Sequence, residues 1–254
     1  MPTKGIIDGS KALVFFSSVD SKGKNDSSGA FEPEAKAFAK LHKIPKEQVI
    51  GIDCVNTKSV VRAKKVLDTI KYFAKVLPEQ CISLSFFGHG WNSGIQFGFN
   101  KAQESVGPLA KQISYLAAES IKVTFYACLT SENEVEDQER KNLGPATDGG
   151  FADRFRDRLV QEMQTPLHPL TGWVDGHKTK GKACCNPFVV RFRLDAHSKA
   201  STDLYDACGG AWVVEPGSES WGRWVTSLSE ESKTGLRYRF PFMGELEIKQ
   251  ELNG

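Results

Sequence analysis

The sequence predicts an α/β protein built on a mostly parallel sheet with helices on both faces. Short apolar runs alternate with amphipathic stretches over roughly the first 160 residues, as expected for strands that alternate with helices. The apolar runs are nearly continuous, which is typical of strands buried on both faces. The 254 residues are 40% hydrophobic and include 16 Phe and 5 Trp, enough core-forming side chains to exclude a disordered chain.

The first half of the predicted core contains three strands and two helices. Residues 11–17 form an apolar run that ends in a polar loop, so we expect a buried strand. A helix is expected at 32–41, and strands are expected at 49–55 and 81–87. Residues 59–77 have apolar side chains at helical spacing, so one side of this helix should be buried. The expected buried side consists of Val60, Val61, Val66, Leu67, Ile70, Phe73 and Val76.

The second half continues the pattern and then becomes richer in strands. A helix is expected at 109–118, a strand at 121–127 and a helix at 151–163, where Phe151, Phe155, Leu159 and Met163 are spaced by four. Residues 131–150 are acidic and then rich in Gly, Pro and Asn, which predicts an exposed linker. The remaining strand-like pieces are 171–174, 188–194, 211–214 and 221–228.

We expect a single domain over residues 1–254. Its α/β core would be residues 10–165, and residues 129–150 would be a processing linker within the chain. Residues 166–254 would be a β-rich part that completes the sheet or forms a small subdomain.

Charge and cysteine content exclude several classes of protein. Lys and Arg number 33 against 31 Asp and Glu, a net charge of +2 that gives no electrostatic basis for nucleic-acid binding. No apolar run has the roughly 18–20 residues of a membrane helix. Residues 1–8 lack the apolar centre of a secretory signal, and six cysteines are too few for a disulfide scaffold. We therefore expect a cytoplasmic protein with reduced cysteines, although export by another route stays open.

Two predicted strands end on residues with reactive side chains. The strand at 81–87 runs into Gly88-His89-Gly90, and the strand at 121–127 runs into Cys128. Functional groups in an open parallel sheet collect at the carboxyl ends of the strands. Since consecutive strands of such a sheet are usually neighbours, the imidazole and the thiol should meet at one edge.

A thiol beside an imidazole is suited to nucleophilic catalysis. The thiolate is the reactive form, and an imidazole can take its proton or stabilise the ion. Gly90 has no side chain to block a carbonyl oxygen, and the backbone N–H groups of Gly90 and Cys128 could donate to an oxyanion. The pattern predicts acyl transfer by a Cys128–His89 dyad.

These motifs resemble those of the caspase-like cysteine peptidases, which include caspases, metacaspases, gingipains, clostripain, legumain and separase. The resemblance rests on an apolar strand that closes on His89-Gly90 and a second that closes on Ala127-Cys128. It covers the order of elements over roughly residues 10–165. It implies a three-layer α/β/α caspase-like fold and endopeptidase activity on a protein or peptide. It also implies His89 as catalytic histidine, Cys128 as nucleophile and Gly90 as oxyanion donor.

The chain departs from the caspase pattern around the cysteine. Residues 126–130 read Tyr-Ala-Cys-Leu-Thr rather than the Gln-Ala-Cys signature, and His89 and Cys128 are 39 positions apart, fewer than the roughly 50 of caspases. Members of the family often cleave themselves after the cysteine strand. Residues 129–150 offer Arg140 and Lys141 to a basic-specific enzyme, and Asp137 and Asp148 to an acidic-specific one.

The sequence leaves the residue before the cut undecided. Four carboxylates could form a pocket for a basic side chain: Asp20, Asp53, Asp148 and Asp175. Three arginines could instead bind an acidic side chain: Arg191, Arg193 and Arg223. His177 belongs to a basic stretch, 176–187, that could approach the same edge and touch the substrate.

Other functions remain open beside the peptidase. The same fold could be an inactive module that binds a partner through its strand-end loops, or a hydrolase of small esters or amides. No metal site or cofactor is expected, because the adjacent Cys184 and Cys185 give poor zinc geometry and the acidic run 132–139 lacks the spacing of a calcium loop. Activation by calcium and the oligomeric state stay open.

Overall fold

A computed structural model shows an α/β protein with a central seven-stranded sheet. It describes residues 7–18, 31–78, 80–131, 150–163, 171–177, 189–194 and 202–205. The strands of the central sheet are β1 Ala12–Ser18, β2 Val49–Asp53, β3 Cys81–Phe87, β7 Ala117–Tyr126, β8 Thr171–His177, β9 Val189–Arg193 and β10 Thr202–Tyr205. The helices are α1 Phe31–Leu41, α2 Ser59–Val76, α3 Gln103–Leu116 and α4 Gly150–Met163. A small second sheet contains β4 Gly90–Trp91, β5 Gly94–Ile95 and β6 Phe99–Asn100.

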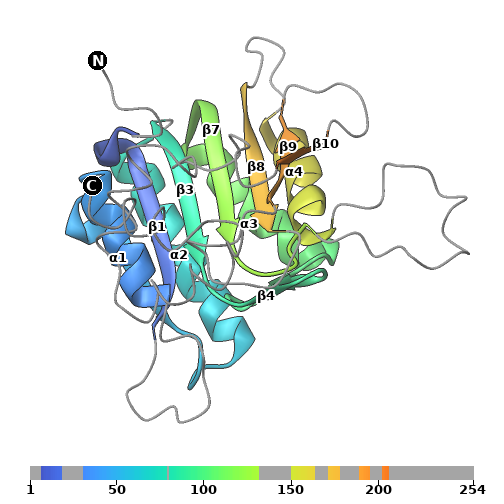
Figure 1. The fold of residues 1–254 in the computed structure, drawn as a ribbon, viewed down its shortest axis with the longest axis horizontal. Coiled ribbons are helices and arrows are strands. Elements are labelled where there is room, and N and C mark those ends of the chain that lie inside the picture. The colour runs from blue at the N-terminus through green and yellow to red at the C-terminus, as the bar shows by residue number, and fades with distance from the viewer. Residues whose placement is uncertain are drawn as a thin grey trace, which may run out of the picture.

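The order of strands in the central sheet is β10-β9-β8-β7-β3-β1-β2 (Figure 1). The five strands from β8 to β2 are parallel to their neighbours, whereas β9 pairs antiparallel with β8, and β10 with β9. The parallel strands are connected by helices, as parallel pairing requires. The expectation of a mostly parallel sheet is therefore confirmed.

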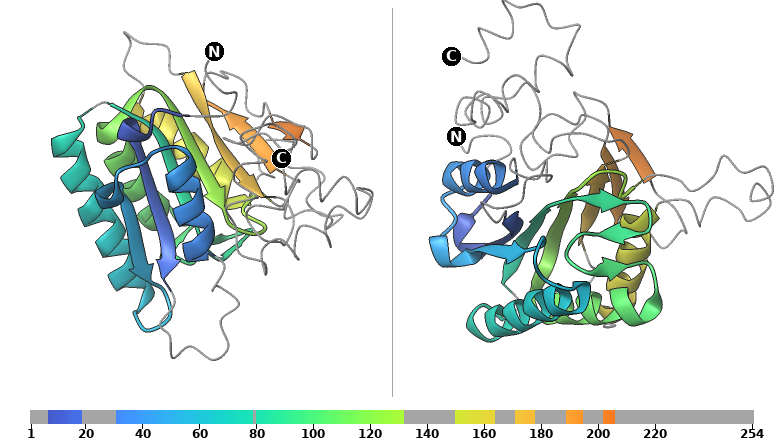
Figure 2. Two further views of the ribbon diagram at one scale, coloured as in Figure 1. Left: turned by 60° about the vertical axis from the view of Figure 1, so that its left-hand side comes forward. Right: turned by 90° about the horizontal axis from the view of Figure 1, so that it is seen from below.

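Helices cover both faces of the sheet (Figure 2). On one face, Phe38 of α1 packs against Phe87 and Tyr126, with ring centroids 5.5 and 5.7 Å apart. On the other face, Phe151 and Phe155 of α4 pack against Phe125, at 5.1 and 5.3 Å. Side chains alternate between the faces of a strand, so neighbouring residues of β7 belong to different layers. The larger apolar core lies on the side of α2, α3 and α4.

Most expected core elements are present, and several need correction. The strand predicted at 81–87 coincides with β3. The third helix begins at Gln103 rather than 109, and Pro108 lies inside it. Its end is also earlier, since residues 117–120 belong to β7.

The second helix begins at Ser59 as expected and ends at Val76, one residue before the expected end, but its expected buried side is partly wrong. Val66, Ile70 and Phe73 of α2 are buried. Val60, Val61 and Val76 are 70%, 50% and 53% exposed, because their positions turn away from the sheet.

The expected linker is wrong at both of its ends. Thr130 and Ser131 are buried, and so is Gly150 at the start of α4. Gly176 and His177, expected in a basic stretch beyond the strand at 171–174, form the end of β8. Residues 132–149, Asp20 and the strands expected at 211–214 and 221–228 lie outside the described residues.

Candidate active site

The ends of β3 and β7 bring His89 and Cys128 to the same edge of the sheet. These two strands are parallel neighbours, and Phe87 pairs in register with Tyr126. Each reactive residue lies two positions beyond a member of this pair. The pairing continues past the strands, since the Gly88 N–H donates to the Tyr126 carbonyl at 3.4 Å. The predicted neighbourhood of the two strand ends is therefore confirmed.

Aromatic side chains form the surroundings of the histidine. The Phe87 and Tyr126 rings beneath the site are stacked, with centroids 4.4 Å apart and planes within 15°. Phe31, the first residue of α1, meets the His89 ring edge-on at 5.0 Å. The His89 ring thus lies on the α1 side of the sheet.

The backbone of His89 is held by a neighbouring hairpin. The Gln96 side-chain oxygen accepts from the His89 N–H at 3.1 Å, and the Gln96 N–H donates to the His89 carbonyl at 2.9 Å. These two bonds fix the peptide groups on both sides of the histidine.

Cys128 begins a turn with an unusual backbone. Its side chain is partly exposed, and Leu129 after it has a φ of 60°. A non-glycine residue with positive φ costs on the order of 1 kcal/mol or more and is common at functional sites. The conformation is maintained because the Thr130 hydroxyl donates to the Ala127 carbonyl at 3.0 Å.

The turn is also anchored to two further elements. The Ser131 N–H donates to the carbonyl of His177 at the end of β8, at 3.1 Å. The Ala152 N–H, in the first turn of α4, donates to the Thr130 carbonyl at 2.8 Å. The segment after the cysteine is therefore fixed between β8 and α4.

Gly90 lies directly against the cysteine turn. A Cβ atom at this position would be 2.8 Å from the Ala127 Cβ, the Cys128 carbonyl oxygen and the Thr130 Cγ2. All three distances are shorter than real Cβ contacts. Only glycine allows the chain after His89 to approach the chain after β7 so closely.

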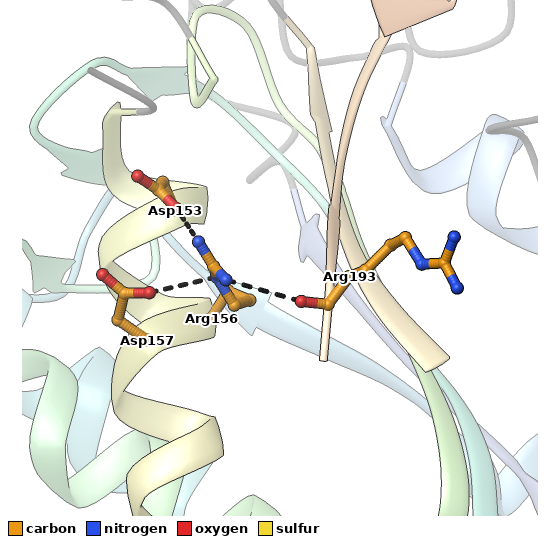
Figure 3. Close-up of polar contacts among 4 residues, drawn as sticks. All are labelled: Asp153, Arg156, Asp157 and Arg193. Atoms are coloured by element: carbon orange, nitrogen blue, oxygen red, sulfur yellow. Dashed lines mark hydrogen bonds and ion pairs between the residues drawn. The ribbon is translucent and has the colours of Figure 1, made fainter. Parts of the chain in front are cut away.

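A buried ion pair holds α4 beside the sheet (Figure 3). Arg156 contacts Asp153 at 2.7 Å and Asp157 at 3.1 Å, and it donates to the Arg193 carbonyl of β9 at 3.5 Å. Arg156 and Asp153 are 3% and 6% exposed. Because the first turn of α4 is hydrogen-bonded to the cysteine turn, these contacts also support the position of that turn.

The candidate specificity residues have other partners in the structure. The Asp53 carboxylate, at the end of β2, accepts from the Asn56 and Val55 N–H groups at 2.9 and 3.0 Å. The hydrogen bond from the Asn56 N–H is the main reason why the pKa of Asp53 is lowered. Asp175 is fully buried in β8 and receives two hydrogen bonds of 2.9 Å from Arg191.

The Asp175–Arg191 pair bears on both proposed specificities. Burial raises the pKa of Asp175 to about 6, against the opposing effect of Arg191. Since Asp175 and Arg191 neutralise each other, neither is placed as a free charge for a substrate. His177 is 1% exposed, its carbonyl accepts from the Ser131 N–H of the cysteine turn, and its ring centroid lies 6.1 Å from that of Tyr126. Arg223 and Asp148 lie outside the described residues.

Two other described cysteines differ sharply from Cys128. Cys54 and Cys81 are buried. Burial raises the pKa of the Cys81 thiol to about 12, and its Sγ lies 3.2 Å from the Ser83 carbonyl. A thiol of this kind stays protonated at neutral pH and is a poor nucleophile.

Sequence reasoning missed four residues of the site: Phe31, Gln96, Leu129 and Thr130. Gln96 lies in the turn between β5 and β6, where Gly94 and Gly98 are the signals for a turn in the sequence. The contact of Phe31 with His89 joins segments far apart in the sequence, so no local pattern predicts it. The positive φ of Leu129 could not be predicted either, because leucine has no preference for that conformation.

Comparisons with protein-family models, curated proteins and solved structures found no match. Within the described ranges, no helix has the length and apolar character needed to cross a membrane. The same part of the chain contains no group of three or more His, Cys, Asp or Glu side chains arranged to hold a metal ion.

Proposed function

We propose that this protein is a cysteine endopeptidase of the caspase-like type, with Cys128 as nucleophile and His89 as general acid and base. The observation that carries the proposal is the matched position of the two residues. Each lies two positions beyond the registered Phe87–Tyr126 pair, on neighbouring parallel strands. Neighbouring strands are about 4.8 Å apart, which is within reach of a thiol–imidazole interaction.

The local backbone supports the same proposal. A partly exposed cysteine precedes a residue with positive φ, and that turn is bonded to β8 and α4. Such a fixed position favours a catalytic nucleophile, because even a small misplacement of the reacting atom lowers the rate of the reaction. A cysteine with a purely structural role does not need an exposed thiol and can be buried, as Cys54 and Cys81 are.

The proposed reaction proceeds through a thioester. The Cys128 thiolate attacks the scissile carbonyl carbon, and the backbone N–H groups of Gly90 and Cys128 stabilise the oxyanion. His89 protonates the leaving amine as the C–N bond breaks. It then takes a proton from water, whose oxygen attacks the thioester carbon. The C–S bond breaks and releases the acid, which leaves the Cys128 thiolate beside protonated His89, as at the start.

The substrate of the proposed enzyme is a peptide or protein. Asp175 and Arg191 are paired, and the Asp53 carboxylate caps its own turn, so these three do not define the substrate charge. Specificity is best read from the cleavage sites themselves.

The test is digestion of a mixed peptide library, with cleavage sites identified by mass spectrometry. We expect cuts with the wild-type chain and none with Cys128→Ala. Cys81→Ala is the matched control, since it removes a thiol from the opposite end of β3 and should leave cutting intact. Equal cleavage by wild type and Cys128→Ala would refute the proposed nucleophile.

The rate of thiol alkylation separates a peptidase from a binding module. With iodoacetamide near pH 7, we expect Cys128 to be modified at least tenfold faster than Cys54 and Cys81, and His89→Asn to slow it. Peptide mapping assigns each modified cysteine. If Cys128 reacts no faster than the two buried cysteines and the library stays uncut, the chain is a non-catalytic module.

A further inference from the structure

The outer flank of α2 exposes apolar side chains beside the last strand of the sheet. Val61, Tyr72 and Val76 are 50%, 60% and 53% exposed. They lie eleven and four residues apart, which places them along one side of the helix. Single exposed apolar residues are ordinary, but several on one flank indicate an interaction surface.

A shallow, open depression lies along this flank. It is lined by side chains of α2 alone: Val61, Lys64, Lys65, Asp68, Thr69 and Tyr72. Lys65 donates to the Gly51 carbonyl of β2 at 3.2 Å, so this side of α2 is close to β2. β2 is the terminal strand of the described sheet. We call α2 residues 61–76, together with the outer edge of β2, the α2 flank.

The charge of α2 selects the kind of partner. The stretch from residue 58 to residue 76 has six basic residues and one acid: Lys58, Arg62, Lys64, Lys65, Lys71, Lys75 and Asp68. The whole chain carries only +2, so positive charge is concentrated here. An acidic segment with some apolar character is the complementary ligand.

The chain contains one such segment. Residues 132–139 read Glu-Asn-Glu-Val-Glu-Asp-Gln-Glu, with five acids in eight positions and a valine in the middle. The segment is anchored at Ser131, which bonds to β8, and at Gly150 of α4. Both anchors are on the far side of β7 from β2, because β3 and β1 intervene. Eight extended residues span at most about 27 Å, so reach alone does not choose between the flank of the same molecule and that of a second one. Concentration-dependent association distinguishes the two.

We propose that the α2 flank of one molecule binds the acidic segment 132–139 of a second copy of this chain. Lys64 contacts Asp68 at 2.5 Å in the structure, and in the complex it and the neighbouring lysines pair with acids of the segment. Val61 and Tyr72 receive the apolar part of the segment. The contact joins two different surfaces, so a pair of molecules can make it twice across a two-fold axis. The inference does not depend on the proposed peptidase activity.

Sedimentation velocity of the full chain tests the proposal. We expect association that increases from 1 to about 100 μM protein and weakens as salt rises. The experiment uses both wild type and Cys128→Ala, so that cleavage of the segment cannot obscure the result. Lys64→Glu/Lys65→Glu and Glu134→Lys/Glu136→Lys should each raise the dissociation constant at least tenfold, and the chain carrying all four changes should recover association.

The controls distinguish binding of the acidic segment from binding of another partner to the α2 flank. Lys111→Glu changes an exposed lysine on α3 and should leave association unchanged. Circular dichroism must show that each variant is folded. A wild-type chain that stays monomeric at 100 μM overturns the proposal, as does association that ignores both charge reversals. Binding of the monomeric chain to phosphatidylserine vesicles, lost in Lys64→Glu/Lys65→Glu, would assign the flank to a membrane surface instead.

Discussion

Replacing Gly90 with alanine tests the close approach of the two strand-end segments. The added methyl group would lie 2.8 Å from three atoms, one of which is the backbone oxygen of Cys128. None of the three is the end of a long flexible side chain, so the backbone must move. Overpacking of this kind costs about 1–3 kcal/mol. We expect Gly90→Ala to lower the free energy of unfolding by that amount, as measured by urea denaturation.

The matched control is Gly107→Ala in α3. A Cβ atom there would meet its nearest neighbour, the Arg158 Nε, at 3.6 Å, which is an ordinary contact. Alanine is favoured over glycine in a helix by roughly 0.5–1 kcal/mol, so this variant should be slightly more stable than wild type. If Gly90→Ala is as stable as Gly107→Ala, then His89 and the cysteine turn are not packed as described.

Two further predictions concern the supports of the cysteine turn. Thr130→Val keeps the shape but removes the hydroxyl that bonds to the Ala127 carbonyl, and should lower unfolding free energy by about 1 kcal/mol. Thr130→Ser, which keeps the donor, should lose less in the same urea titration. Asp153→Asn should destabilise by about 1–3 kcal/mol, because the buried guanidinium of Arg156 loses its closest carboxylate. Asp157→Asn should cost less, since Asp157 is 41% exposed, and an equal cost in thermal melts would contradict the assignment.

The parts of the fold that could be predicted are those with a local signal. β3 was located residue for residue because seven mostly apolar positions are bounded by polar ones. The neighbourhood of β3 and β7 followed from their succession along the chain, and this placed His89 near Cys128. Both inferences used only the pattern of apolar residues and the rules of parallel sheets.

The parts that could not be predicted depend on tertiary contacts or on elements too short to show a period. β4, β5 and β6 have two residues each, so no alternation is visible in them. The helix expected at 109–118 starts earlier and contains Pro108, with Val106 and Leu109 buried. The exposed Val60, Val61 and Val76 of α2 are the same residue type as the buried Val66, so residue type alone does not show which of them are buried. Which side faces the sheet depends on the neighbours of the helix rather than on its own period.

Two buried groups give opposite contributions to the pH dependence of stability. His42 is 1% exposed, and burial, with a smaller effect of Lys122, lowers its pKa from 6.5 to about 3. As the pH falls from 6.5 towards 3, the unfolded chain binds a proton that the folded chain does not, so stability falls by on the order of 4 kcal/mol. Asp175, with its pKa raised from 3.8 to about 6, lowers stability as the pH rises through that range.

Single substitutions at these positions should therefore change the pH profile in opposite directions. Asparagine at position 42 can still accept from the Ile7 N–H, which now bonds to His42 Nδ1 at 3.2 Å, but it cannot titrate. We expect His42→Asn to lose less stability than wild type when urea titrations are moved from pH 7 to pH 4. Asp175→Asn should lose more than wild type over the same interval, because the opposing contribution is gone. Parallel profiles for wild type and both variants would mean that neither group changes its pKa on folding, and the burial of both side chains would then have to be less complete than the structure has it.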